Sequence, residues 1–243
     1  MPAPGLKTKF ALVIPTLNEA GNVEPLLNRI QTALEPLSIP YEIVIVDDGS
    51  IDGTQQVVLN YAAQNTHVRL LVRNNRKGLA GAVIHGWQHT DADLLGVMDA
   101  DLQHPPELLP ALLAAVEGGA DIAIGSRYVQ QTRVQGWNPF RQAISRASTW
   151  VTLPFQRKVR VKDPMSGFFV LRRDCIEGVN LQPQGFKILL EILVRGRIRS
   201  AVEVPFQFGL RHAGKSKADV TVAFHYFSLL GKLSRDLLFK GQQ

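Results

Sequence analysis

The 243-residue sequence contains a single cysteine, Cys175, which excludes a disulfide framework and a zinc site built on paired cysteines. It also has no run of 18 uncharged apolar residues, so it predicts no membrane-spanning helix. The first ten residues carry no apolar stretch of the kind found in secretion signals. With 45% hydrophobic and 20% charged residues, the composition is globular, and we expect one α/β domain with a C-terminal extension.

Acidic and basic residues are unevenly distributed along the chain. Residues 1–126 hold seven Lys and Arg against fourteen Asp and Glu, a balance of −7, whereas residues 127–243 have a balance of +13, within an overall +6. This asymmetry indicates an acidic half that could hold a metal ion and a basic half that could meet phosphate or an anionic surface. Unequal solubilising charge explains the same counts, so charge alone does not decide between the two interpretations.

Short runs rich in Val, Ile and Leu alternate with helical patterns, which is typical of a mostly parallel sheet covered by helices. Apolar stripes at helical spacing run through residues 23–34 and 105–116, and a further helix is expected around 186–195. Residues 220–240 read as one amphipathic helix, which either packs on the domain or lies on a membrane. The expected strands are residues 10–15, 41–47, 68–72, 93–99, 121–125, 167–172 and 201–208.

Polar residues follow four of these strands, at the carboxyl edge where open α/β sheets bind ligands. They lie at residues 15–19, 47–50, 99–103 and 125–127. One such cluster is ordinary turn chemistry, but four clusters on one edge favour a binding site.

Asp99, Asp101 and Gln103 alternate along the chain after the fourth strand. In an extended chain they would share one face but span roughly 13 Å, so the chain must turn if one ion is to touch all three. Two carboxylates and an amide oxygen suit Mg²⁺ or Mn²⁺, which prefer oxygen ligands. An isolated pair of this kind is more often a solvated turn, and the rest of the sequence has to decide.

Seven motifs decide it, because together they resemble the family 2 glycosyltransferases of GT-A fold, and within them the dolichol-phosphate (polyprenol-phosphate) mannose synthases. The match covers about residues 10–217. It implies a Rossmann-like, mostly parallel sheet flanked by helices, with a small antiparallel addition. The motifs are PTLNE (15–19), VDDGS (46–50), KGLAGA (77–82), DADLQHPPE (99–107), GSRY (125–128), DPMSGF (163–168) and RHAGKSK (211–217).

The resemblance also implies the site residues. Metal on the donor diphosphate would be held by Asp99, Asp101 and Gln103, and the acceptor phosphate by Arg127, Arg141 and Ser145. Catalysis would be carried by Asp101, Arg127, Arg211 and Lys217. The nucleotide sugar would be bound by Pro15, Thr16, Glu19, Asp47, Asp48, Asp99, Arg211, Ser216 and Lys217.

The activity implied is inverting transfer of a sugar, mannose from GDP-mannose in the first place, to a polyprenyl (dolichyl) monophosphate with Mg²⁺ or Mn²⁺ as cofactor. UDP-glucose, UDP-GlcNAc or another sugar nucleotide as donor, and a catalytically silent sugar-nucleotide binder, stay open as alternatives. A nucleic-acid partner is not expected, because the basic half has no nucleic-acid motif and strand-end carboxylates repel phosphate backbones. The expected place is cytoplasmic, peripheral at the cytoplasmic face of a membrane, with a membrane-anchoring subunit or a missing anchor.

The expected domains are a catalytic domain at 1–218, divided into a nucleotide-sugar and metal half (9–126) and an acceptor half (127–218), and the helix at 219–243. Leu17 departs from the family, which often has an aromatic residue there. The QxxRW signature of the processive branch is absent, which argues against a cellulose-like or chitin-like synthase. His104 and His212 fall inside motifs but are interpreted as exposed neighbours of the site.

Overall fold

The computed structural model describes residues 8–74, 78–129, 151–156, 158–182, 187–207 and 209, and the structural statements below concern these residues. The expected C-terminal helix and the domain boundary at 218 lie outside them. Five α-helices and four short 3-10 helices are described; the 3-10 helices are η1 (Glu35–Leu37), η2 (Pro106–Leu108), η3 (Leu153–Phe155) and η4 (Arg173–Cys175). The helices are α1 (Ala20–Leu34), α2 (Thr54–Ala62), α3 (Leu79–Gln88), α4 (Leu109–Glu117) and α6 (Ile188–Arg195).

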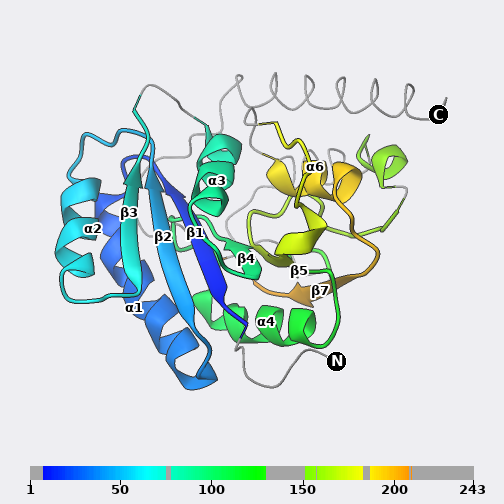
Figure 1. Ribbon diagram of the computed structural model, residues 1–243, viewed down its shortest axis with the longest axis horizontal. Helices are drawn as coiled ribbons and strands as arrows, with labels where there is room; N and C mark the ends of the chain where they lie inside the picture. Colours follow the sequence, from blue (N-terminus) through cyan, green and yellow to red (C-terminus); the bar gives the residue numbers. More distant parts are fainter. Residues whose placement is uncertain are drawn as a thin grey trace.

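One seven-stranded sheet runs through the protein, with helices on both faces (Figure 1). The strands are β1 (Phe10–Thr16), β2 (Tyr41–Asp47), β3 (Val68–Val72), β4 (Leu94–Val97), β5 (Ile122–Ser126), β6 (Phe169–Arg172) and β7 (Ala201–Pro205). Their order is β3-β2-β1-β4-β6-β5-β7. Strand β6 is antiparallel to β4 and β5, and the other pairs are parallel. The predicted fold class is confirmed, and the antiparallel addition lies inside the sheet rather than at an edge.

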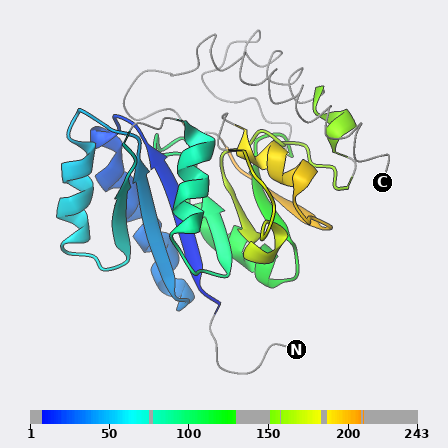
Figure 2. The ribbon, with the colours of Figure 1, turned by 45° about the horizontal axis from the view of Figure 1, so that its top comes forward.

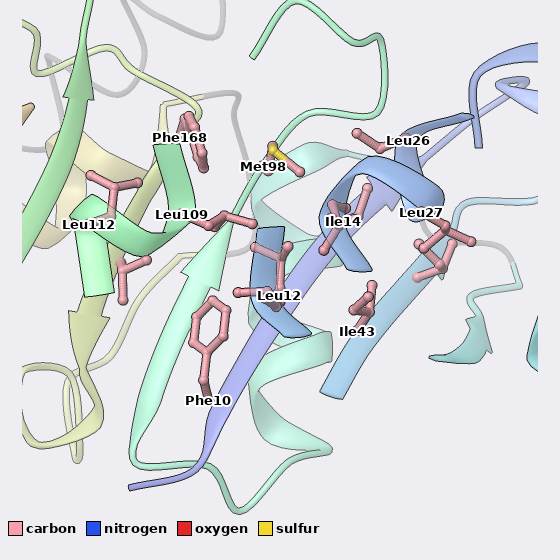
Figure 3. Close-up of a cluster of buried hydrophobic side chains, with 14 of the residues drawn as sticks. Phe10, Leu12, Ile14, Leu26, Leu27, Ile43, Met98, Leu109, Leu112 and Phe168 are labelled. Atoms are coloured by element: carbon pink, nitrogen blue, oxygen red, sulfur yellow. The ribbon is translucent and has the colours of Figure 1, made fainter. Parts of the chain in front are cut away.

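The sheet buries apolar side chains on both faces, as expected for strands composed of Val, Ile and Leu. On β1, Phe10, Leu12 and Ile14 point into a cluster covered by α1 and α4 (Figure 3). Ala11 and Val13 point the other way, into a cluster covered by α3 and α6. Figure 2 shows these two helical layers from a tilted view. Burial of each large side chain contributes about 1.5 to 3 kcal/mol, so the core holds the strand ends in fixed positions.

Helix α3 packs closely on the sheet because it presents small residues to it. A Cβ atom on Gly86 would lie 2.6 Å from a methyl carbon of Val13. This close approach places the start of α3 next to the loop that follows β2, where Gly78 donates its backbone N–H to Asp48 at 2.8 Å. No helix within the described ranges is both long enough and apolar enough to cross a bilayer.

Candidate active site

The loops after β1 and β2 form the first part of the site. The parallel register sets Thr16 beside Asp47, and the Thr16 hydroxyl donates to the Asp47 carboxylate at 3.0 Å. Further donors to this carboxylate are the backbone N–H groups of Gly49 and Ser50, at 3.1 and 2.9 Å, the Ser50 hydroxyl, and the Gln55 amide at 2.7 Å. Burial raises the pKa of Asp47, but these hydrogen bonds outweigh burial and hold its pKa below the ordinary value.

Asp48 is buried and makes a two-point ion pair with Arg73, at the end of β3. The Arg73 Nε atom donates to Asp48 Oδ1 at 2.7 Å and Nη2 donates to Oδ2 at 3.1 Å. Both side chains are only 7% exposed. The predicted nucleotide ligands Asp47 and Asp48 therefore shape this loop through contacts within the protein. Sequence reasoning missed Arg73, because a single arginine after a short apolar strand carries no motif.

The loop that enters α1 is tied to the loop that enters α2. The backbone N–H of Asn18 donates to the Ser50 hydroxyl oxygen at 2.8 Å, and the backbone N–H of Glu19 donates to the Thr54 hydroxyl oxygen at 2.9 Å. The predicted ligands Pro15 and Glu19 lie partly buried in this part of the site. These bonds fix the first two strand-end clusters relative to each other.

The loop after β4 turns sharply between Asp99 and Gln103. Leu102 adopts a left-handed backbone conformation with φ of 61°, and Gln103 donates its N–H to Asp101 Oδ1 at 3.2 Å. The turn that a shared ion requires is therefore present. The Asp99 side chain is 35% exposed, and Asp101 and Gln103 are partly buried.

The donor set of this turn fits a hard divalent cation. The Gln103 side-chain nitrogen donates to the carbonyl of Gly209 at 3.1 Å, so its amide oxygen is the atom suited to a metal. Gly167 makes room for the carboxylate of Asp99, since a Cβ atom at this glycine would lie 2.7 Å from Asp99 Oδ2. Among the described residues no cluster of three or more His, Cys, Asp or Glu side chains could hold a metal. A metal here would thus depend on two carboxylates and an amide, as the sequence predicts.

His104 is buried, and the interpretation of it as an exposed neighbour is wrong. Its imidazole is 3% exposed and packs against the rings of Phe168 and Phe206, at centroid distances of 5.4 and 5.6 Å. Burial lowers the pKa of His104 to about 4, so the ring is neutral at pH 7. The His104 ring contacts the Asp99 turn directly, because the Asp99 backbone N–H donates to His104 Nδ1 at 3.4 Å.

Arg127, at the end of β5, forms a two-point ion pair with Asp163. The Arg127 Nε and Nη2 atoms each donate to an Asp163 oxygen at 2.7 Å, and the Arg127 backbone N–H donates at 3.1 Å. Burial lowers the pKa of Arg127, and the Asp163 carboxylate raises this pKa by more, so the guanidinium stays charged. Asp163 has no exposed surface. It was given no site role from sequence, although it is the one acid among ten basic residues at 127–173.

The segment 163–168 connects the arginine to the β4 turn. At its start, Glu203 of β7 accepts the backbone N–H groups of Lys162 and Asp163, at 2.8 and 3.0 Å. In its middle, the Ser166 hydroxyl donates to the carbonyl of Gly125 at 2.7 Å. At its end lies Gly167, against Asp99. This segment therefore fixes the distance between the predicted metal turn and the predicted phosphate arginine.

Lys187, directly before α6, is a further charged group that sequence reasoning missed, after Arg73 and Asp163. Its ammonium donates to the carbonyl of Met165 at 3.5 Å. Burial and the nearby Arg127 lower the pKa of Lys187, while Asp99 and Asp163 act in the opposite direction. The Lys187 ammonium therefore lies within electrostatic range of the Asp99 turn and of the Arg127–Asp163 ion pair.

The remaining predicted residues, Arg141, Ser145, Arg211, Ser216 and Lys217, lie outside the described residues. Those within them fall into two groups, one around β1 and β2 and one around β4 and β5. The second group brings together oxygen ligands of the metal-binding kind and fixed cations of the phosphate-binding kind. Such a site can hold a charged phosphate next to a metal-bound leaving group.

The family model for "Glycosyl transferase family 2" matches residues 11–179. Two curated relatives carry the name dolichol-phosphate mannosyltransferase. The protein of Pyrococcus furiosus is 45% identical over 93% of this chain, and this chain spans only 64% of that relative's length. The protein of Saccharomyces cerevisiae is 35% identical over 94% of this chain and 88% of its own length.

Solved structures share the fold at lower identity. Mannosyl-3-phosphoglycerate synthase from Rubrobacter xylanophilus superposes with a TM-score of 0.70 at 19% identity, over 97% of this chain and 76% of its own. A mannosyltransferase from Pyrobaculum calidifontis, in complex with GDP-Man and Mn²⁺, has a TM-score of 0.56 at 18% identity, over 84% of this chain and 57% of its own. The matched model covers well over half of the sequence, and so this chain belongs to glycosyl transferase family 2.

Proposed function

We propose that this chain is an inverting glycosyltransferase that transfers mannose from GDP-mannose to the phosphate of a polyprenyl (dolichyl) monophosphate. The observation that carries the proposal is the segment 163–168. One of its ends orients Arg127, a phosphate-binding type of side chain, and its other end lies against Asp99 in a turn of metal-binding type. The names of the two curated relatives support the same reaction.

The acceptor chemistry fits a site without a dedicated general base. A phosphate monoester is largely dianionic at pH 7, so its oxygen can attack the anomeric carbon without first losing a proton. The bond from the anomeric carbon to the acceptor phosphate forms while the bond to the nucleoside diphosphate breaks, and GDP leaves with the electron pair. Attack from the opposite face inverts the anomer, so an α-linked donor gives a β-linked product.

The described residues bind and orient the reactants. Asp99, Asp101 and Gln103 would hold Mg²⁺ or Mn²⁺, which when bound neutralises charge on the departing diphosphate. Arg127, aligned by Asp163, would hold the acceptor phosphate in line with the sugar. The hydrogen-bonded loops after β1 and β2 would form the wall on which the nucleoside lies. Outside the described residues, Arg141 and Ser145 would complete the acceptor site, and Arg211, Ser216 and Lys217 would close over the donor.

The acceptor also implies a membrane surface as partner. The prenyl tail stays in lipid, because each buried CH₂ group contributes about 0.8 kcal/mol. Basic residues near anionic lipid contribute roughly 1 kcal/mol each, and several from the basic segment 127–173 could bind such a surface. We therefore expect the protein at the cytoplasmic face of a membrane, with or without an anchoring subunit. Vesicles with anionic lipid should sediment it at low salt and release it at high salt.

The test offers one labelled donor at a time, GDP-mannose, UDP-glucose or UDP-GlcNAc, to the full chain with a polyprenyl phosphate and Mn²⁺ or Mg²⁺. Label extracted into the organic phase measures transfer. We expect label from GDP-mannose, and none when the metal is removed with a chelator. Transfer from a UDP-sugar alone would keep the reaction type and change the donor, while binding of a sugar nucleotide without any transfer would contradict the enzyme and favour the silent binder.

A further inference from the structure

The ammonium group of Lys187 has no role in the function proposed above. Lys187 lies partly buried before α6, and its ammonium makes one hydrogen bond within the described residues, a long one of 3.5 Å to the carbonyl of Met165. In the described part of the chain no carboxylate lies within 4 Å of this ammonium. A lysine ammonium has three N–H donors, so the described residues satisfy only part of its hydrogen-bonding capacity.

The acids around Lys187 are committed to other groups. Asp163 is paired with Arg127 at 2.7 Å, and Asp99 belongs to the predicted metal turn. Glu191, one turn further along α6, pairs with Arg195 at 3.2 Å and accepts the backbone N–H of Gln182 at 2.7 Å. The charge of Lys187 is therefore not consumed by an ion pair within these residues.

Helix stability does not explain the lysine either. Lys187 is the residue that precedes the first turn of α6. The N-terminus of a helix carries partial positive charge and favours anions, so a cation at this position opposes the helix dipole. Burying a charge without a partner also costs free energy, and a ligand of opposite charge would offset that cost.

The position of the ammonium identifies the chemistry of that ligand. It donates to a carbonyl in the middle of the segment 163–168, between Arg127 at one end and Asp99 at the other. On the proposed function, the group that occupies this space is a phosphate. We infer that Lys187 is a substrate-binding residue whose ammonium donates a hydrogen bond to a phosphate oxygen of a substrate, beside Arg127. This inference rests on the proposed function and adds a ligand to its site.

Two phosphates have the required chemistry, the acceptor monophosphate and the donor diphosphate, and a binding experiment separates them. The full chain and its variants are titrated with a short-chain prenyl phosphate in detergent, and separately with GDP plus Mn²⁺. Lys187→Met removes the charge and keeps an unbranched side chain of nearly the same length. Lys158→Met is the matched control, because Lys158 likewise donates to a backbone carbonyl, that of Gly196 at 2.9 Å, away from the site.

We expect Lys187→Met to weaken binding of one of the two ligands at least tenfold, and the affected arm names the phosphate. Lys158→Met should leave both affinities within twofold of the parent. Equal binding by the parent and a folded Lys187→Met variant in both arms would overturn the inference while leaving the proposed function intact. A parent chain that binds neither ligand would contradict the proposed function itself, and the inference with it.

A second measurement does not depend on folding of the variant. The unmodified chain is treated with an amine-reactive acetylating reagent with and without each ligand, and the modification of each lysine is quantified by mass spectrometry. We expect one ligand to protect Lys187 at least fivefold and to leave Lys158 unprotected. Modification of Lys187 that neither ligand alters, at ligand concentrations that saturate binding, would overturn the inference.

Discussion

Carboxylates at two neighbouring parts of the same sheet edge differ in their burial and in the hydrogen bonds that they accept. After β1 and β2, Asp47 has no exposed surface and Asp48 is 6% exposed, and Asp47 accepts five hydrogen bonds from the protein. After β4, the Asp99 side chain is 35% exposed. The difference teaches that acidic motifs at one sheet edge can be tied into the protein frame in one place and leave a carboxylate partly exposed in another.

The first way to test this comparison is to remove a carboxylate from the β4 turn. We expect Asp101→Ala to lower kcat at least about 10³-fold, because a metal bound through one carboxylate fewer no longer stabilises the leaving group. The melting temperature should change by less than about 2 °C, since this side chain supports the turn more than the core. Label transfer and a thermal melt on the same preparation measure both. Normal turnover in the presence of Mn²⁺ would refute the role of Asp101.

The reverse result is expected at the other part of the edge. Asp48→Ala leaves Arg73 buried without its carboxylate, which costs about 3 to 5 kcal/mol of unfolding free energy. Urea titration measures it. Asp174→Ala is the matched control, because the Asp174 side chain is 69% exposed and lies 3.7 Å from Arg172, so its removal should cost less than about 0.5 kcal/mol. Equal stability of the Asp48→Ala and Asp174→Ala variants would contradict the structural role assigned to Asp48.

A smaller effect is expected where the segment 163–168 meets the metal turn. Gly167→Ala would introduce a Cβ atom 2.7 Å from Asp99 Oδ2 and displace that carboxylate. We expect the Mn²⁺ concentration for half-maximal activity to rise about tenfold, with the KM for the lipid acceptor nearly unchanged. Manganese titration at saturating substrates shows the shift. A selective rise in acceptor KM would instead assign Gly167 to the acceptor side.

The smallest expected effect is on the unfolding free energy at acidic pH. Hydrogen bonds hold the pKa of Asp47 below its ordinary value of 3.8, so this carboxylate stabilises the fold above about pH 4 and loses that contribution as pH falls through its folded pKa. The loss is on the order of 1 kcal/mol. Asp47→Asn, which cannot gain a proton there, should flatten the fall in unfolding free energy below pH 4. Urea titration at a series of pH values measures this slope, and an equally steep fall in the variant and the parent would contradict this role of Asp47.

Most of the fold was predictable from the sequence because its determinants are local. Runs of Val, Ile and Leu gave all seven strands, and the stripes at 23–34 and 105–116 correspond to α1 and to η2 with α4. The position and direction of β6 were not predictable, since a run such as residues 169–172 is equally apolar in either orientation. Its place between β4 and β5 depends on contacts far apart in sequence.

The same limit applies to the site. The sequence singled out the motif residues, whose roles stay predictions, and the chain turns between Asp99 and Gln103. The partners that hold them were not found, because Arg73 and Asp163 act through ion pairs that only the folded chain brings together. His104 was misjudged for a related reason, since the aromatic rings that bury it come from residues more than 60 positions away.

The most direct test of the account is a crystal of the full chain grown with GDP-mannose and Mn²⁺, in which anomalous scattering locates the manganese. We predict the ion at roughly 2.0 to 2.3 Å from carboxylate oxygens of Asp99 and Asp101, with a diphosphate oxygen completing its shell. An ion bound at Asp47 or Asp48, or a nucleotide away from this edge of the sheet, would contradict the division between a supporting and a ligand-binding pair of acids.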